Sequence, residues 1–193
     1  MTKSGVFWLR EDFRIKRNDA LTYATLNHEN VSVVYIFKKK EFEKKREAKQ
    51  WWIYKSLLNF EKDLDNLNIN LEVILSDSYE SAFDKILQYK NFSIYWNKVY
   101  EPDFLKLDEK IALHLNKKNV PYKIFKGNIL NEFNEVKKND NTPFKVFSPF
   151  WKNAEKIYLD KGFSKDSLPK KRTSKSKFLK EYSKKEDVLK AEH

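Results

Sequence analysis

The feature that most constrains the fold is the alternation of five short apolar runs with helical patterns. The runs are rich in β-branched and aromatic residues, and the first two are almost continuously apolar. Such runs are typical of strands that are buried on both faces of a parallel sheet. The predicted strands are residues 5–9, 31–37, 71–75, 92–96 and 122–125.

Amphipathic helical patterns fill the intervals between these runs. Asn18 and Asp19 are candidate N-caps of the first helix. The second interval carries apolar residues in steps of three or four from Trp51 to Leu67, which predicts a long amphipathic helix. Right-handed crossovers convert this order into a layered structure. The sequence therefore predicts an α/β fold, an open five-stranded parallel sheet that is doubly wound and Rossmann-like, with helices on both faces.

The chain divides into two predicted parts, because the regular alternation ends near residue 127. Residues 1–163 form the predicted α/β domain, and the aromatic segment 144–158 is expected to pack back on it. Residues 164–193 are rich in Lys and Ser, a composition typical of a basic linker.

The net charge of +11 favours polyanionic partners, but it is unevenly distributed. Residues 164–193 carry ten Lys and Arg against five Asp and Glu, so they contribute +5 of the total. A lysine-rich segment is more typical of a solvated linker than of a specific DNA site. We expect any DNA binding through Lys170, Lys171 and Arg172 to be weak, non-specific and sensitive to salt.

Several kinds of chemistry are excluded by residues that the sequence lacks. No cysteine is present, which excludes disulfides, thiolate zinc sites and a cysteine nucleophile within this sequence. The three glycines, Gly5, Gly127 and Gly162, are too far apart to form a GxGxxG or P-loop motif. A dehydrogenase and a P-loop enzyme are therefore disfavoured. A bound nucleotide or flavin would need another mode of recognition.

The sequence also carries no sign of export or membrane insertion. The first ten residues lack the pattern of a secretory signal, and no apolar run approaches the roughly 18 residues that span a bilayer. We therefore expect a soluble, cytoplasmic protein.

Polar and charged side chains follow the predicted strands at their carboxyl ends. Open α/β sheets bind ligands beyond these ends, near the point where the strand order reverses. The rule selects Leu9 and Arg10 after the first strand, Lys38 after the second, and Asn97 and Glu101 after the fourth. We expect these residues to line a crevice that suits a planar ligand with polar edges. The alternative is structural: Arg10 and its neighbours would only form salt bridges at a strand end.

Four segments are similar to the signatures of one protein family. Residues 7–15 read FWLREDFRI and are followed by NDAL, residues 51–57 read WWIYKSL, residues 95–102 read YWNKVYEP and residues 144–152 read FKVFSPFWK. In this order and spacing, the segments resemble the N-terminal α/β domain of the DNA photolyase and cryptochrome family. The resemblance extends over roughly residues 5–160.

The resemblance implies a protein of two parts. In the family, the α/β domain can hold a light-harvesting pigment, and a linker leads to a helical domain that binds FAD and the damaged bases of DNA. Light energy passes from the pigment to reduced FAD, and an electron splits the pyrimidine dimer. The implied function is the antenna domain of a deoxyribodipyrimidine photolyase, a carbon–carbon lyase. The FAD domain is absent from this sequence, so we expect no repair activity from the chain alone.

The resemblance does not identify the pigment, and it leaves methenyltetrahydrofolate, FMN and an empty pocket as alternatives. Deazaflavin is less favoured, because Glu11 and Val99 depart from the residues typical of its binders. Folate-type members use a polar–acidic pair after the Tyr-Glu step, and here Asp103 and Phe104 occupy these positions. Asp103 therefore joins the candidate pigment-binding residues.

The resemblance also implies partners and leaves two other functions open. The implied partners are the FAD-binding helical domain, in the same protein or in a separate chain, and damaged DNA through the complete enzyme. One alternative is a cryptochrome-type domain for blue-light signalling. The other is a stand-alone α/β module that binds a nucleotide or a partner protein.

Overall fold

The computed structural model describes residues 4–43, 47–88, 92–161, 168–176, 179 and 184. Each predicted strand is confirmed, and a helix follows every strand up to β5. The elements are β1 (Ser4–Leu9), α1 (Asp19–Asn27), β2 (Asn30–Lys38), α2 (Lys39–Glu43), α3 (Glu47–Asn66), β3 (Asn70–Ser76), α4 (Tyr79–Ile86), β4 (Phe92–Asn97), α5 (Pro102–Lys117), β5 (Tyr122–Phe125) and α6 (Phe147–Lys161).

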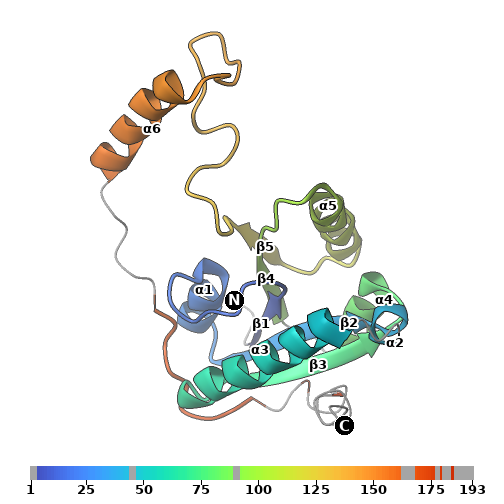
Figure 1. Ribbon diagram of the computed structural model, residues 1–193. Coiled ribbons are helices and arrows are strands. Elements are labelled where there is room, and N and C mark those ends of the chain that lie inside the picture. Colours follow the sequence, from blue (N-terminus) through green and yellow to red (C-terminus); the bar gives the residue numbers. More distant parts are fainter. Residues whose placement is uncertain are drawn as a thin grey trace.

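The five strands form one parallel sheet in the order β3-β2-β1-β4-β5 (Figure 1). The chain first builds outward from β1 to β3, and then adds β4 and β5 on the other side of β1. The strand order therefore reverses between β1 and β4, where open α/β sheets bind ligands. This order confirms the predicted doubly wound, Rossmann-like fold.

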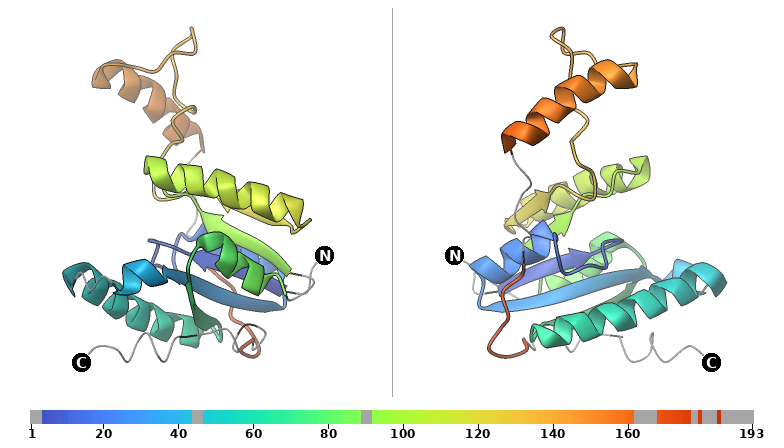
Figure 2. Two further views of the ribbon diagram at one scale, coloured as in Figure 1. Left: turned by 90° about the vertical axis from the view of Figure 1, so that its right-hand side faces the viewer. Right: turned by 60° about the vertical axis from the view of Figure 1, so that its left-hand side comes forward.

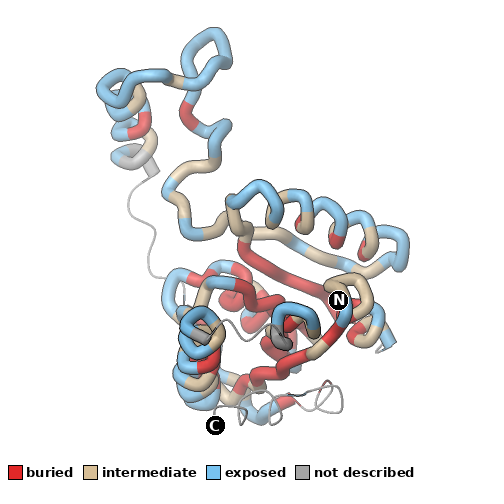
Figure 3. Tube along the Cα trace, turned by 45° about the vertical axis from the view of Figure 1, so that its right-hand side comes forward, coloured by how far each residue is buried: buried red, intermediate tan, exposed pale blue. Residues whose placement is uncertain are grey.

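Both faces of the sheet are covered by helices, because side chains alternate between the faces along each strand. On one face, Phe7 and Leu9 of β1 pack with α1 and α3, while on the other face Val6 and Trp8 pack with α4 and α5. Figure 2 shows the helices around the sheet from two further directions. Figure 3 shows that the buried residues are concentrated in the strands.

Side-chain caps fix the starts of two of these helices. The Asn18 side chain accepts a hydrogen bond from the backbone N–H of Leu21 at 3.1 Å, which confirms it as the N-cap of α1. Ser78 accepts one from the N–H of Ser81 at 3.1 Å and caps α4 in the same way. Both helices therefore begin directly above the carboxyl ends of the strands.

Helix α6 stands apart from the sheet, at the end of a long loop that leaves β5 (Figure 1). Phe147 is 70% exposed and Trp151 is 41% exposed. Their rings stack on each other, with centroids 6.2 Å apart and an angle of 11° between the planes. The expectation that segment 144–158 packs back on the domain is therefore wrong. Phe144, Phe147, Phe150 and Trp151 of this segment pack among themselves.

The described part of the basic C-terminal segment packs on the domain. We call residues 168–176, together with Leu179 and Lys184, the C-terminal strap. The Arg172 N–H donates to the Leu67 carbonyl oxygen at 2.8 Å, and the Lys184 N–H donates to the carbonyl oxygen of Val73 in the edge strand β3 at 2.6 Å. Leu179 is fully buried against the face covered by α4 and α5. These contacts differ from those of a free, solvated segment.

Two predictions from the sequence have no counterpart in the described residues. The predicted boundary between residues 163 and 164 lies outside them, so the division into domain and linker stays a prediction. Within the described ranges, no helix is long and apolar enough to cross a membrane. The cytoplasmic location also stays a prediction.

Candidate ligand-binding site

A cavity of about 540 Å³ lies over the carboxyl ends of β1 and β2. We call it the β1–β2 cavity. The loop after β1 and the starts of α3, α4 and α5 enclose it. Its volume falls in the range of small-molecule sites in proteins. Its walls include Trp8, Phe13, Tyr35, Trp52, Tyr79 and Phe104.

Aromatic rings from both sides of the sheet line this cavity. Phe13 meets Trp52 edge to face at 5.9 Å between ring centroids, on the side of α3. Trp8 meets Tyr79 at 5.6 Å on the side of α4. Aromatic side chains offer flat apolar surface at a defined position, so such walls suit a planar ring system. The cavity thus has the chemistry of a site for a heteroaromatic ligand.

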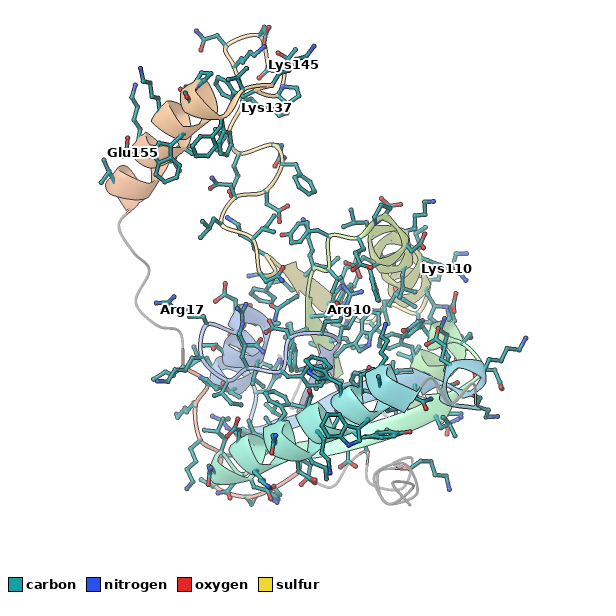
Figure 4. The ribbon with its side chains drawn as sticks, in the orientation of Figure 1. Arg10, Arg17, Lys110, Lys137, Lys145 and Glu155 are labelled. Carbon is teal, nitrogen blue, oxygen red and sulfur yellow. The ribbon has the colours of Figure 1, made fainter. Side chains whose placement is uncertain are left out.

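Arg10 forms part of the wall, but its charge is already paired. Its guanidinium donates to the Asp108 carboxylate of α5 at 2.7 and 3.3 Å, and to the backbone carbonyl oxygen of Asn97 at 3.2 Å. Both side chains of the ion pair are almost completely buried. Burial lowers the pKa of Arg10 and raises that of Asp108, while each charge opposes the shift of the other. Figure 4 shows Arg10 inside the domain, far from Lys145 and Glu155 of the segment 128–161, which we call the α6 arm.

The guanidinium of Arg10 also contacts two rings of the cavity wall. Its central carbon lies 4.8 Å from the centroid of Trp8 and 5.4 Å from that of Phe104. Cations attract the faces of aromatic rings at such distances. Arg10 therefore holds these two rings in place, and its buried Nε atom has no hydrogen-bond partner.

A second cavity, of about 510 Å³, lies beside the first at the point where the strand order reverses. We call it the β1–β4 cavity. Asn97 is its central polar residue, and all of the side chain's polar atoms are engaged. The Asn97 amide donates to Asp12 and to Asn18, each at 2.9 Å, and its oxygen accepts from the N–H of Ala20 at 3.2 Å. Asn97 therefore fixes the start of α1 against the end of β4.

Asp12 belongs to the same network, and its pKa is perturbed. Burial raises the pKa of this carboxyl group, while the nearby Arg14 charge and the hydrogen bond from Asn97 act in the opposite direction. Arg14 Nε lies 2.7 Å from the Asp12 carboxylate. The strand-end charges selected from the sequence thus form salt bridges and hydrogen bonds, as the structural alternative predicts.

Of the six predicted pigment-binding residues, three line at least one cavity and three line neither. Leu9 and Arg10 line the β1–β2 cavity, and Arg10 and Asn97 line the β1–β4 cavity. Lys38 lines neither cavity, because it pairs with Glu41 and lies over the ring of Tyr79. The remaining two, Glu101 and Asp103, are exposed at the start of α5 and line neither cavity.

Sequence reasoning missed most of the aromatic wall. Tyr35 lies within β2 rather than after it, and Tyr79 and Phe104 come from the first turns of helices. The rule about strand ends does not select such positions. The one signal in the sequence was the pair Trp51 and Trp52 at the start of the predicted long helix, of which Trp52 lines the cavity.

The described residues offer no evident metal site. They contain no group of three or more His, Cys, Asp or Glu side chains that could hold a metal ion. His114 instead pairs with Asp84 at 2.8 Å between α5 and α4, and His28 lies 2.6 Å from the Tyr95 hydroxyl. Both contacts join elements of the fold, which is the common role of histidines at such positions.

The fold and the two cavities define a doubly wound α/β domain with one cavity at its switch point and an aromatic cavity beside it. Residues 5–172 match the family model described as DNA photolyase. The chain therefore belongs to the DNA photolyase family, which includes the cryptochromes, and corresponds to the N-terminal α/β domain of its members.

Photolyases and cryptochromes resemble the chain to a similar degree. A deoxyribodipyrimidine photo-lyase of Agrobacterium fabrum is 26% identical over 154 residues, which cover 80% of this chain and 32% of that protein. Cryptochrome-2 of Arabidopsis thaliana is 29% identical over 174 residues, which cover 88% of this chain and 27% of that protein. The chain thus spans about a third of the length of these relatives.

Solved structures of the family share the fold. A bacterial class III photolyase from Agrobacterium tumefaciens superposes with a TM-score of 0.73 at 23% identity, over 92% of this chain and 36% of that one. An archaeal photolyase from Sulfolobus tokodaii superposes with a TM-score of 0.70 at 18% identity, over 97% of this chain and 41% of that one. The archaeal protein was solved with two FAD molecules, which implied a novel light-harvesting cofactor in it.

Proposed function

We propose that this chain is the light-harvesting domain of a deoxyribodipyrimidine photolyase and that its pigment binds in the β1–β2 cavity. The complete protein would use the absorbed light to repair pyrimidine dimers in DNA. FAD and the damaged bases would bind to a helical domain that this sequence does not contain. Membership of the family and the aromatic β1–β2 cavity, which lies beside the switch point, support this proposal.

The observation that carries the proposal is the aromatic wall of the cavity. Trp52 and Phe13 on one side, and Tyr79 and Phe104 on the other, leave space for a planar ring. FMN and methenyltetrahydrofolate both present such a ring. The arrangement also excludes water from much of the ring surface, which favours binding through apolar contact.

The α6 arm supports the second part of the proposal, docking onto a helical domain. Phe147, Trp151 and Leu159 expose apolar surface on this one helix, which packs on no strand of the described sheet. Exposed apolar patches of this kind are typical of surfaces that bind another protein unit. Lys152, Glu155 and Lys156 are exposed on the same helix, so the docking surface of the helical domain would combine apolar groups with charged ones of both signs.

The proposal is tested by adding FMN and methenyltetrahydrofolate separately to the purified chain and recording absorption in the near-ultraviolet and blue. We expect one of them to bind at one molecule per chain. Trp52→Ala should weaken this binding about tenfold or more, because it removes one aromatic wall. Trp51→Ala is the matched control, because Trp51 is similarly exposed on α3 but lines neither cavity. If both variants bind like the wild type, the pigment does not occupy this cavity.

A cryptochrome function is the second candidate, and it is supported by the 29% identity to Cryptochrome-2. The α/β domain would then serve blue-light signalling rather than repair. The complete protein separates the two candidates: a photolyase restores dimer-containing DNA under blue light, whereas a signalling protein leaves the dimers intact.

A further inference from the structure

Two phenol groups reach the β1–β2 cavity from opposite sides of the sheet. Tyr35 comes from β2, on the face covered by α3, and Tyr79 comes from the first turn of α4 on the other face. In the described part of the chain, neither hydroxyl has a hydrogen-bond partner. Neither hydroxyl is completely buried, so water solvates it in the free protein, and a bound ligand with acceptor atoms would replace that water.

Both phenols stay protonated at neutral pH and can therefore act as donors. Burial raises the pKa of Tyr79 to about 12, and the negative charge of Glu41 adds to this effect. Burial also raises the pKa of Tyr35, with smaller contributions from Tyr79 and Glu11. A neutral phenol donates one hydrogen bond, which fits a carbonyl oxygen or a ring nitrogen on the ligand.

Among the described residues, the lining of the cavity offers little for the recognition of a phosphate. Arg10 is paired with Asp108, and the lining carries no glycine-rich loop. Lys49 is the one lysine among the described residues that line the cavity, and Glu11 and Glu41 line it too. The two carboxylates oppose an anionic group at this place. We therefore expect the cavity to recognise the polar edge of the ligand's ring rather than a phosphate group.

We propose that Tyr35 and Tyr79 determine the ligand class of the β1–β2 cavity by donating hydrogen bonds to acceptor atoms on the edge of a planar heteroaromatic ring. The ligand would be a flavin-type or pterin-type ring, recognised through its carbonyl oxygens and ring nitrogens rather than through a phosphate. This inference rests on the proposed function, because it concerns the same cavity. It adds that Tyr35 and Tyr79 are the residues that recognise the ring of the ligand.

The test measures the dissociation constants of FMN, riboflavin and methenyltetrahydrofolate with the wild type and with Tyr35→Phe, Tyr79→Phe and the double variant. Each substitution removes one hydroxyl and keeps the ring in the wall. We expect each to weaken binding about two- to tenfold, and the double variant by roughly the product. Riboflavin, which lacks the phosphate, should bind about as well as FMN. Tyr122→Phe is the control, because this hydroxyl bonds Asn116 away from both cavities.

Three other outcomes would overturn the inference, and they separate it from the proposed function. If the wild type binds a pigment and both Phe variants bind it equally well, the inference fails while the proposed function stands. A second outcome is that FMN binds, riboflavin does not, and Lys49→Ala abolishes the binding of FMN. The cavity would then recognise the phosphate of FMN, and the inference would also fail. If the wild type binds none of the three compounds, both the inference and the pigment site are overturned.

Discussion

At the scale of single residues, the buried ion pair between Arg10 and Asp108 is the most consequential contact of the site. It joins the loop after β1 to α5, two segments that lie 98 positions apart in the sequence. Taking both charges out of water is costly, and their attraction offsets this cost only while both are present. We therefore expect the pair to specify how α5 sits on the sheet more than it stabilises the fold.

This reasoning gives a prediction for two variants of the pair. Asp108→Asn leaves the Arg10 charge buried without its partner and should lower the free energy of unfolding by about 3–5 kcal/mol. Arg10→Met combined with Asp108→Leu removes both charges and should come within about 1 kcal/mol of the wild type, or exceed it. Urea denaturation followed by tryptophan fluorescence measures both. A double variant as unstable as Asp108→Asn would show that the pair contributes net stability.

Residue roles were harder to predict from the sequence than residue positions. The rule about strand ends correctly placed Arg10 and Asn97 at the edge of the cavities. It could not show that Asp108 would pair with Arg10, because Asp108 lies within a helical pattern far along the chain. The engagement of Asn97 by Asp12, Asn18 and Ala20 likewise depends on three segments that only the fold brings together.

At the scale of elements, the strands and helices were predictable because each has a strong local cause. Buried runs of β-branched and aromatic residues predicted the strands, and Asn18 predicted the start of α1. The C-terminal strap was not predictable, because its composition is that of a solvated segment. Its position depends on contacts with distant segments, such as the hydrogen bonds that join Arg172 to Leu67 and to Asn68, and these have no signature in the sequence.

The strap should contribute measurably to stability. The Arg172 guanidinium donates to the carbonyl oxygen of His28 at 2.6 Å, beyond its backbone contact with Leu67, and Leu179 is fully buried. Leu179→Ala should lower the free energy of unfolding by about 2–5 kcal/mol, because it leaves a cavity in the core. Arg172→Ala should cost about 1 kcal/mol, because its side chain is only partly buried.

Lys171→Ala is the control for the strap, because Lys171 is exposed and has no described contact. Thermal unfolding followed by circular dichroism compares the three variants. If Leu179→Ala unfolds like the wild type, the strap leaves the core readily in solution. DNA binding through Lys170, Lys171 and Arg172 stays a prediction, although Arg172 is already engaged by the domain.

At the scale of the whole molecule, the strap and the α6 arm behave oppositely. The strap returns to the domain, where the Lys184 N–H donates to the carbonyl oxygen of Val73 in the edge strand β3, whereas α6 stands apart from the sheet (Figure 1). An edge strand with free backbone groups can pair with other chains, and this hydrogen bond occupies one such group of β3. An exposed aromatic helix has no such role within the domain, which fits the proposal that it docks onto another unit.

This contrast predicts that the aromatic surface of α6 can be changed without loss of the domain. Replacing Phe147 and Trp151 together by Ser should change the free energy of unfolding by no more than about 0.5 kcal/mol, because both side chains are exposed on a helix that stands apart from the sheet. Ile111→Ala, at a fully buried position of α5, should cost about 2–5 kcal/mol in the same denaturation experiment. A loss above about 1.5 kcal/mol in the α6 variant would mean that the arm packs on the sheet in solution, because exposed substitutions rarely cost that much. An unchanged domain stability would leave the aromatic surface of α6 free to bind a partner.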